Sequence, residues 1–434
     1  MALALASTLP TPASHATLMA AADARTGICL PWHRARAEAW EVPGMVHVAV
    51  PAEPVNDWQG VSGAVAWQDP VQACEAALAE ALERYAAARA SVPVRRRADV
   101  PELELWAEDR FALYSSAQRA QAGFPWPMPV GDDDGFSPVF RLHDNQRVWV
   151  PQELVGLGVR AGRARMPSTS SGLAAQKDTA GSGPWRALLR ATQEVLERDA
   201  LAVTWLNGLG GLEIDLPERC ESVASAIGAE VVALDLTQAW SPHPVVAVMG
   251  RHHARGQGRH AFGIACRATL DEAIDKAWLE WAQSLRFADH LVQQFSVPAE
   301  PAALRRFDEH AAYYTCHPQG WAQLPLLKHR RRRAHDAMTK ESAHTGPQSE
   351  LSQLQDLVLC LLEHGIELAY RELTPPDVAQ AGLRVVRVLS PQLSLLHADE
   401  RAPFLGGRTG DWRWRYPDAV AHHPLSNPWP HPLG

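Results

Sequence analysis

The sequence predicts an α+β fold in which helices pack against a mixed sheet. Long segments of helical composition are separated by short β-branched runs, without the regular alternation of a βαβ repeat. The chain has 434 residues, 46% of them hydrophobic, which is enough for a large core. Length alone allows two or three domains or one elaborate domain.

Three segments have the composition and periodicity of helices. The first is rich in Ala, Leu and Glu, and the second begins after Pro184 and ends before Asn207. The third carries Asp271 and Glu272 near its start, where the helix dipole favours acidic side chains. The predicted helices span residues 70–88, 185–206 and 270–291.

Strand-like runs rich in Val and Leu lie between and after these helices. They cover residues 231–236, 245–249 and 385–389. Segments 166–184 and 339–352 are rich in Ser, Thr and Gly or other polar residues, and their composition is typical of linkers.

Charge and cysteine content narrow the class of protein. The chain carries 41 Lys and Arg against 49 Asp and Glu, a formal net charge of −8 that argues against a general nucleic-acid binder. Its six cysteines show no C-x-x-C spacing, so we expect reduced thiols and a cytoplasmic protein. No apolar run approaches the roughly 18–20 residues of a membrane helix, and we expect no membrane partner.

Two of the predicted helices carry the same E-x-x-E-R spacing. Residues at i and i+3 share one face of a helix and i+4 lies close by, so each motif presents two carboxylates beside one guanidinium. Two such groups across a common cleft would hold magnesium and phosphate. Solvated helix faces remain the alternative for either motif taken alone. The motifs consist of Glu80, Glu83 and Arg84, and of Glu194, Glu197 and Arg198.

Familiar catalytic motifs are absent from the sequence. It has no G-x-x-x-x-G-K-[ST] phosphate loop, no G-x-S-x-G nucleophile elbow and no H-E-x-x-H zinc motif. A nucleotide site in this chain would therefore have to use another arrangement of side chains.

Five short motifs follow one another along the chain. They are 23–27 (DARTG), 79–85 (AEALERY), 170–175 (SSGLAA), 194–206 (EVLERDALAVTWL) and 280–286 (EWAQSLR). The last of them gives the third helix an E-x-x-Q-x-x-R pattern. In sequence and in order, the five segments resemble motifs of the YcaO family, whose members use ATP to activate peptide amides.

The resemblance implies a YcaO-like α+β fold around an ATP site without a P-loop. It implies a YcaO domain over residues 1–405, with a core of about 60–405 after an N-terminal extension at 1–59, and a Pro-rich tail at 406–434 that reaches the active site. The cofactors implied are ATP and Mg2+. Implied magnesium ligands are Glu80, Glu83, Glu194 and Glu197. Implied nucleotide contacts are Arg84, Arg198, Gln283 and Arg286.

The chain ends in alternating prolines, similar to the P-x-P-x-P terminus of azoline-forming members of the family. Alternating prolines favour a stiff polyproline II arm, and such an arm could carry the terminal carboxylate into a cleft. Pro430, Pro432 and Gly434 are therefore the predicted catalytic elements, and a disordered tail is the alternative. Because terminal residues rarely support a large core, we expect truncation at residue 430 to spare thermal stability.

The function implied is ATP-dependent cyclodehydration of Cys, Ser or Thr in a ribosomal precursor peptide, which forms thiazoline or oxazoline rings. A separate E1-like or ThiF-like leader-binding protein is the expected partner, with a flavin dehydrogenase as a further candidate, and we expect a homo-oligomer.

Three residues depart from the family pattern, and they keep other functions open. Ala76 replaces the usual Ser, Gln176 replaces a Gly, and Arg186 replaces an acid that binds metal in the family. An enzyme that forms a thioamide or amidine is one alternative. The other is a degenerate, non-catalytic scaffold subunit.

Overall fold

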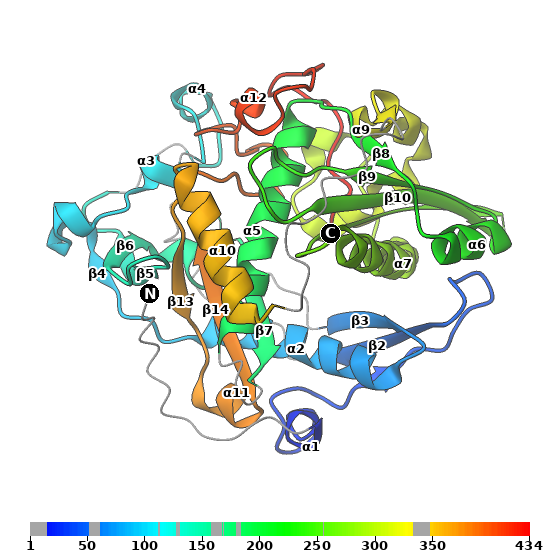
Figure 1. The fold of residues 1–434 in the computed structure, drawn as a ribbon, viewed down its shortest axis with the longest axis horizontal. Coiled ribbons are helices and arrows are strands. Elements are labelled where there is room, and N and C mark those ends of the chain that lie inside the picture. The colour runs from blue at the N-terminus through cyan, green and yellow to red at the C-terminus, as the bar shows by residue number, and fades with distance from the viewer. Residues whose placement is uncertain are drawn as a thin grey trace.

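The fold contains three β-sheets, and the long helix α5 (Trp185–Leu206) stands near the centre of the molecule (Figure 1). The computed structural model describes residues 15–51, 61–111, 113–126, 131–157, 167, 169–178, 184–254, 256–332 and 348–434. The predicted α+β class is confirmed, and the division of the strands among three sheets is a feature that the sequence pattern did not reveal.

The N-terminal sheet is antiparallel and has three strands in the order β1-β2-β3. Helix α2 (Pro70–Arg89) packs against β2 and β3 and also contacts β7 of the next sheet, so it joins the two. The strands are β1 (His33–Arg34), β2 (Met45–Pro51) and β3 (Val61–Trp67).

The second sheet has six strands in the order β4-β5-β13-β14-β7, with β6 paired to β5. All of its pairs are antiparallel, and α5 packs against β14 and β7. Its strands are β4 (Arg95–Arg96), β5 (Gly135–Arg141), β6 (Arg147–Pro151), β7 (Leu173–Lys177), β13 (Ala369–Glu372) and β14 (Leu383–Leu389).

The third sheet has five strands in the order β11-β10-β9-β8-β12. Helix α7 (Leu270–Gln294) packs along β11 and β10 on one face of this sheet. Helix α5 contacts the same two strands on the opposite face of the sheet. Helix α5 therefore lies between the two larger sheets (Figure 1). The strands are β8 (Leu212–Ile214), β9 (Ala229–Asp235), β10 (Val245–Ala254), β11 (Gln257–Cys266) and β12 (Arg331–Arg332).

The remaining helices are shorter and cover the outside of this arrangement. Helix α8 packs on α7 and β11, and α10 packs on α5. They are α1 (His15–Met19), α3 (Glu108–Phe111), α4 (Ser116–Arg119), α6 (Glu218–Ala226), α8 (Phe307–Cys316), α9 (Pro325–Lys328), α10 (Glu350–Glu363), α11 (Pro376–Gln380) and α12 (Trp412–Arg415).

Side-chain caps mark the N-terminal ends of two of the three long helices, α2 and α7. Asp69 caps α2 by accepting hydrogen bonds from the backbone N–H groups of residues 71 and 72, and Pro70 follows it at the first helical position. Thr269 caps α7 by accepting from the N–H of Glu272. The predicted helices 70–88, 185–206 and 270–291 are thus confirmed, with α7 extending three residues further.

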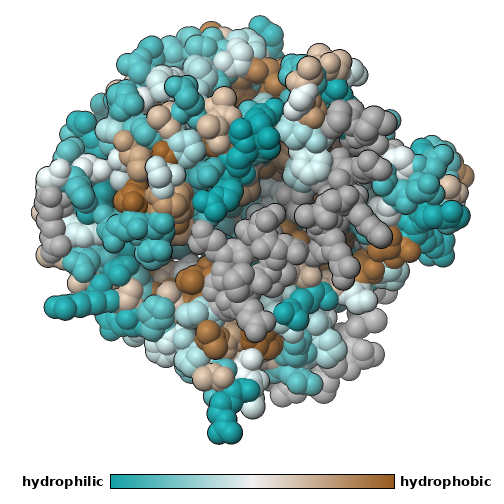
Figure 2. Space-filling view, turned by 180° about the vertical axis from the view of Figure 1, so that it is seen from behind, coloured by the Kyte–Doolittle hydropathy of each residue, from teal (hydrophilic) through white to brown (hydrophobic). Residues whose placement is uncertain are grey.

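Hydrophilic residues predominate among the described residues on the face shown in Figure 2. On the face opposite to that of Figure 1, hydrophobic residues lie in small groups between hydrophilic ones (Figure 2). Within the described ranges, no helix is both long and apolar enough to span a membrane.

Candidate active site

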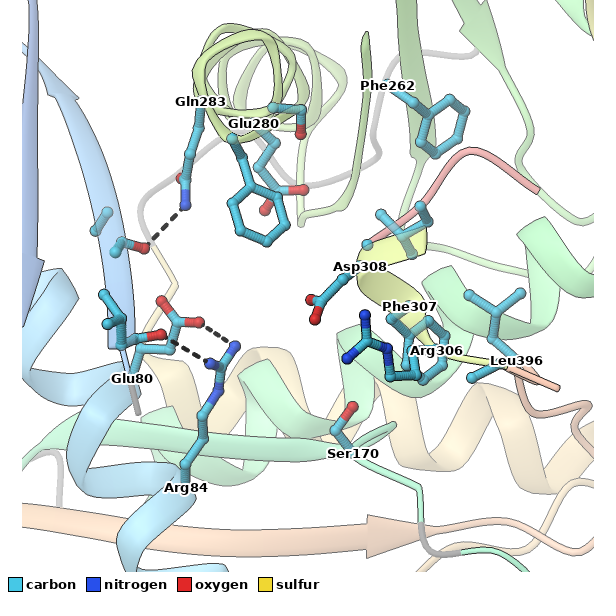
Figure 3. Close-up of a pocket in the computed structure, with 18 of the residues that line it drawn as sticks. Glu80, Arg84, Ser170, Phe262, Glu280, Gln283, Arg306, Phe307, Asp308 and Leu396 are labelled. Atoms are coloured by element: carbon cyan, nitrogen blue, oxygen red, sulfur yellow. Dashed lines mark hydrogen bonds and ion pairs between the residues drawn. The ribbon is translucent and has the colours of Figure 1, made fainter. Parts of the chain in front are cut away.

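A cavity of about 1730 Å³ opens where α2, α5 and α7 meet. It gathers charged and polar side chains from the three helices, which lie far apart in the sequence. Figure 3 shows Glu80 and Arg84 of α2 together with Glu280 and Gln283 of α7. All eight predicted metal and nucleotide residues line it: Glu80, Glu83, Arg84, Glu194, Glu197, Arg198, Gln283 and Arg286. Their convergence supports the proposed site, whereas their chemical roles stay predictions.

The α2 cluster consists of Glu80, Glu83 and Arg84. The guanidinium of Arg84 lies 2.5 Å from the carboxylate of Glu80, and both side chains are about one-third exposed (Figure 3). Glu83 lies deeper, and its Oε2 accepts a hydrogen bond of 2.8 Å from the backbone N–H of Ala175 on β7. One acid of this cluster is therefore fixed to a strand while the other faces the open cavity.

The α5 cluster consists of Glu194, Glu197 and Arg198. Arg198 reaches both acids, with its nitrogens 3.4 Å from Glu194 Oε1 and 3.1 Å from Glu197 Oε1. Oε2 of Glu197 accepts a hydrogen bond of 3.1 Å from the N–H of Cys266 at the end of β11. The two clusters thus share one design, in which the second glutamate is anchored to the backbone of a neighbouring strand.

Burial and mutual repulsion raise the pKa values of the deeper acids. Burial raises the pKa of Glu83 to about 7, and the negative charge of Glu80 adds to this effect. Burial raises the pKa of Glu194 to about 7 against the opposing effect of Arg198, and Glu83 raises it further across the cavity. Burial raises the pKa of Glu197 to about 8, with Glu280 and Glu194 contributing. All three acids therefore hold their protons more tightly than a solvent-exposed glutamate does, mainly because they are buried.

These acids fit a magnesium ion. Carboxylate oxygens are the hard donors that Mg2+ prefers, and a bound cation would favour the ionised acids against the burial and repulsion that raise their pKa values. Among the described residues, no three His, Cys, Asp or Glu side chains are already close enough to hold a metal ion.

Helix α7 closes the cavity with Glu280, Gln283 and Arg286. The amide of Gln283 donates a hydrogen bond of 2.9 Å to the carbonyl of Gly63 on β3, and Arg286 pairs with the buried Glu41. Figure 3 shows Glu280 and Gln283 on the wall above Glu80 and Arg84. Glu280 was not predicted as a ligand, although it belongs to the E-x-x-Q-x-x-R pattern.

The C-terminal tail enters the cavity from the side of α8. Leu433 and Gly434 line the cavity, whereas Pro430 and Pro432 are buried behind its wall. A Cβ atom on Gly434 would lie 2.6 Å from Cβ of Ala311, so the end of the chain fits closely between α8 and its surroundings. Of the three predicted catalytic elements, only Gly434 reaches the cavity.

The buried tail corrects one expectation from the sequence. Residues 430–433 are all buried, and His431 is fully buried. Removing residues 430–434 would take apolar surface and hydrogen bonds out of the core, so truncation is expected to lower thermal stability. The general rule for termini fails here because the segment packs inside the molecule.

The three departures from the family pattern lie in two places. Ala76 and Gln176 line the cavity. Arg186 does not line it and lies in the first turn of α5, where it adds positive charge beside Arg190. Burial lowers the pKa of Arg190 to about 10, and Arg267 and Arg186 lower it further. This end of α5 is therefore basic, whereas the middle of the helix is acidic.

Two buried arginines that the sequence analysis did not single out support the site from behind. Arg387 on β14 is fully buried, donates to the carbonyl of Ser171 at 2.7 Å, and opposes the rise in pKa of Glu83 and Glu194. Arg415 forms a fully buried ion pair of 2.7 Å with Asp199, which fixes α5 to α12. The sequence does contain one indication of Arg387, because a charged residue there interrupts a run of valines in a predicted strand.

Several solved structures have a fold similar to that of this chain. The chain superposes on a heterocyclase in complex with substrate and cofactor with a TM-score of 0.74 at 18% identity, covering 97% of this chain and 57% of that one. It also matches YcaO from Methanopyrus kandleri bound with AMPPCP and Mg2+, with a TM-score of 0.60 at 17% identity, covering 84% and 86%. The E. coli microcin synthetase McbBCD complex matches with a TM-score of 0.57 at 12% identity, covering 86% and 90%.

The chain spans little more than half of the heterocyclase, and identities at this level establish a common fold. No curated protein matches the sequence. The family model described as YcaO cyclodehydratase, ATP- and Mg2+-binding, matches residues 68–394, well over half of the chain. The matched range contains all three helices that build the cavity. The chain therefore belongs to the YcaO family.

Proposed function

We propose that the protein is an ATP-dependent cyclodehydratase that forms thiazoline or oxazoline rings in a ribosomal precursor peptide. A Cys, Ser or Thr side chain of the peptide attacks the preceding amide carbonyl. This attack closes the five-membered ring and leaves an oxyanion, which ATP phosphorylates with release of ADP. Phosphate then leaves together with the amide N–H proton, and the C=N bond of the thiazoline or oxazoline forms. The observation that carries this proposal is the single cavity shared by both E-x-x-E-R clusters and the C-terminal residue.

The residues of α2 and α5 would act on the phosphates and their metal. Glu80, Glu83, Glu194 and Glu197 would hold Mg2+, which when bound offsets the negative charge of the nucleotide. Arg198 lies among these acids and would point its guanidinium at a phosphate oxygen. Preorganised charges of this kind stabilise the charge that develops during phosphoryl transfer.

Gln283 and Arg286 would contact the nucleotide after small changes in their present contacts. Gln283 is bound to a backbone carbonyl of β3, and Arg286 is bound to Glu41. Both partners belong to the N-terminal segment that lies outside the range matched by the family model. Nucleotide binding would therefore be coupled to the position of the three-stranded sheet.

The C-terminal carboxylate is the proposed base that takes the proton from the reacting peptide. Its position at the cavity supports this role. Adding three residues after Gly434 should lower cyclisation strongly, because the carboxylate is displaced while the buried residues 430–433 are kept. Product mass after incubation with precursor peptide is the measurement. Unchanged cyclisation by the extended protein would rule the carboxylate out as the base.

A precursor peptide and partner proteins complete the proposed reaction. The microcin synthetase match includes a McbBCD complex with pro-MccB17 bound. By analogy we propose an E1-like or ThiF-like partner that binds the leader, with a flavin dehydrogenase as a later component. We further propose a cytoplasmic homo-oligomer, in keeping with six unpaired cysteines.

The test combines the purified chain with a Cys-, Ser- or Thr-rich precursor encoded nearby, ATP and Mg2+, with and without the partner. We expect loss of one water per ring and matching ATP consumption, faster with the partner because tethering raises the effective concentration, to about millimolar for a short flexible linker. A product in which sulfur replaces oxygen, or an amidine, would favour the alternative enzymes. Partner-dependent binding without ATP consumption would identify a scaffold subunit.

A further inference from the structure

The end of the tail is held through its backbone carbonyls. Trp205 of α5 donates from its indole N–H to the carbonyl of Trp429 at 2.6 Å. Tyr314 of α8 donates from its hydroxyl to the carbonyl of Pro430 at 2.7 Å. His310, one turn earlier on α8, has its Nδ1 3.0 Å from the carbonyl of His431. Three successive carbonyls of the tail therefore each meet one side chain of the protein body.

The prolines of the tail explain why it is held through its backbone carbonyls. Pro430 and Pro432 have no N–H, and a polyproline II segment makes no internal hydrogen bonds, so its carbonyls stay available. Proline-rich peptides are bound in the same way by aromatic grooves in other proteins. Here the binding groove and its ligand belong to one chain, so holding the tail requires no association between molecules.

His431 fixes the register of the tail against this groove. It is fully buried, its ring stacks on that of His310 with centroids 4.0 Å apart, and its Nε2 lies 2.6 Å from the carbonyl of His397. A shift of the tail by one residue would place a proline at this stacked position. The distance from His431 to the terminal carboxylate is then set by only three residues.

We propose that Trp205, Tyr314 and His310 form a carbonyl clamp that positions the C-terminal carboxylate of Gly434 in the active-site cavity. They are positioning residues, since they touch the tail and do not line the cavity. The functional part of this inference rests on the proposed role of the carboxylate. The clamp itself is a structural property that can be measured without any enzymatic turnover.

Two neighbouring tyrosines provide a matched pair of variants. Tyr314 and Tyr313 are both buried on α8, at 1% and 4% exposure. The hydroxyl of Tyr313 donates to the carbonyl of Ala299 at 2.9 Å, which is outside the tail. Tyr314→Phe and Tyr313→Phe each remove one hydrogen bond from a tyrosine hydroxyl to a carbonyl, which is buried at Tyr314 and partly buried at Tyr313. Each should lower global stability modestly, and only the first should loosen the tail.

The first measurement is the rate at which a carboxypeptidase releases Gly434 and Leu433 from the full-length folded protein. Tyr314→Phe should increase this rate roughly fivefold, the change expected when one hydrogen bond that holds the tail is lost. Tyr313→Phe should leave the rate at the wild-type value. Equal release rates for the two variants would overturn the clamp, as would an increase with Tyr313→Phe alone.

The second measurement is the steady-state kinetics of cyclisation. Tyr314→Phe should lower kcat while leaving the KM for ATP unchanged, because the nucleotide residues lie on other parts of the cavity wall. Tyr313→Phe should change neither constant. If the release rate increases while kcat stays at the wild-type value, the clamp holds the tail for stability only, and the positioning role is wrong. His310→Gln gives a second variant at the next carbonyl.

These two measurements separate the clamp from the proposed function. Loss of cyclisation in the wild-type protein would contradict the proposed reaction, whereas the release rates would still test the clamp. If the wild-type protein forms no rings but Tyr314→Phe still releases Gly434 and Leu433 faster, the clamp is confirmed. Its proposed role in catalysis would then be disproved.

Discussion

The two E-x-x-E-R clusters have the same spacing but occupy different environments. In the α2 cluster, Glu80 and Arg84 are about one-third exposed and pair with each other at the open side of the cavity. In the α5 cluster, Arg198 contacts both acids, and the side chain of Glu197 is only 7% exposed. Spacing places the charges on one helix face, and the surrounding fold decides how strongly each charge acts.

The difference matters because electrostatic interactions strengthen with burial. An exposed pair such as Glu80–Arg84 is screened by water and contributes little to stability. The buried acids of α5 carry raised pKa values and face Glu83 and Glu280. We therefore expect the α5 cluster to dominate both catalysis and the response of the apoprotein to pH.

The largest effect is expected from Glu197→Ala. It removes the most buried acid of the two clusters, and loss of one preorganised electrostatic partner commonly costs about 10²–10³ in rate. Peptide-dependent ATP hydrolysis is the measurement. Glu218→Ala, at an exposed position on α6, is the control and should keep the wild-type rate. Equal rates for both variants would show that Glu197 has no part in turnover.

How much of this site the sequence could predict depends on the range of the interactions involved. The helices at 70–88, 185–206 and 270–291 follow from composition, capping residues and spacing, which are local properties. The family motifs indicated which side chains would share a cavity. Neither kind of information indicated that Arg387 lies behind the acids, since its hydrogen bond joins β14 to Ser171, which lies 216 positions earlier in the sequence.

The burial of the C-terminal tail also depends on contacts between residues that are distant in the sequence. Its polyproline composition was evident, but its burial depends on Trp205, Tyr314 and His310, which come from two distant helices. A rule about termini in general could not include these partners. The Asp199–Arg415 ion pair is a second case, because nothing near Asp199 in the sequence indicates a partner on α12.

The second prediction compares the two arginines directly. Arg198→Ala should reduce ATP hydrolysis far more than Arg84→Ala, because Arg198 is less exposed and contacts two acids. Steady-state hydrolysis at saturating precursor measures the difference. Similar losses for the two variants would mean that burial does not separate the clusters.

The third and smallest expected effect concerns stability and pH. The pKa of Glu197 is raised to about 8, so its protonated form is favoured in the folded state and its stabilising effect is lost as the pH rises through that value. The apoprotein should therefore lose thermal stability between pH 6.5 and 8.5, and Glu197→Gln should reduce this loss. Each kcal/mol corresponds to a Tm change of about 2–4 °C or less in a protein of this size.

Differential scanning calorimetry of the two apoproteins measures this slope. Added Mg2+ should raise the Tm of the wild type more at pH 8.5 than at pH 6.5, because the acids are then ionised. A pH slope that is the same in Glu197→Gln and wild type would contradict the raised pKa.

The central claim is that both clusters serve one magnesium–nucleotide site, and isothermal titration calorimetry with a non-hydrolysable ATP analogue tests it most directly. Two double variants, Glu80→Gln with Glu83→Gln and Glu194→Gln with Glu197→Gln, are compared with the wild type. We predict that the wild type binds the analogue only with Mg2+, and that each double variant loses this binding. Magnesium-dependent binding that survives in either double variant would contradict the claim that α2 and α5 build one site.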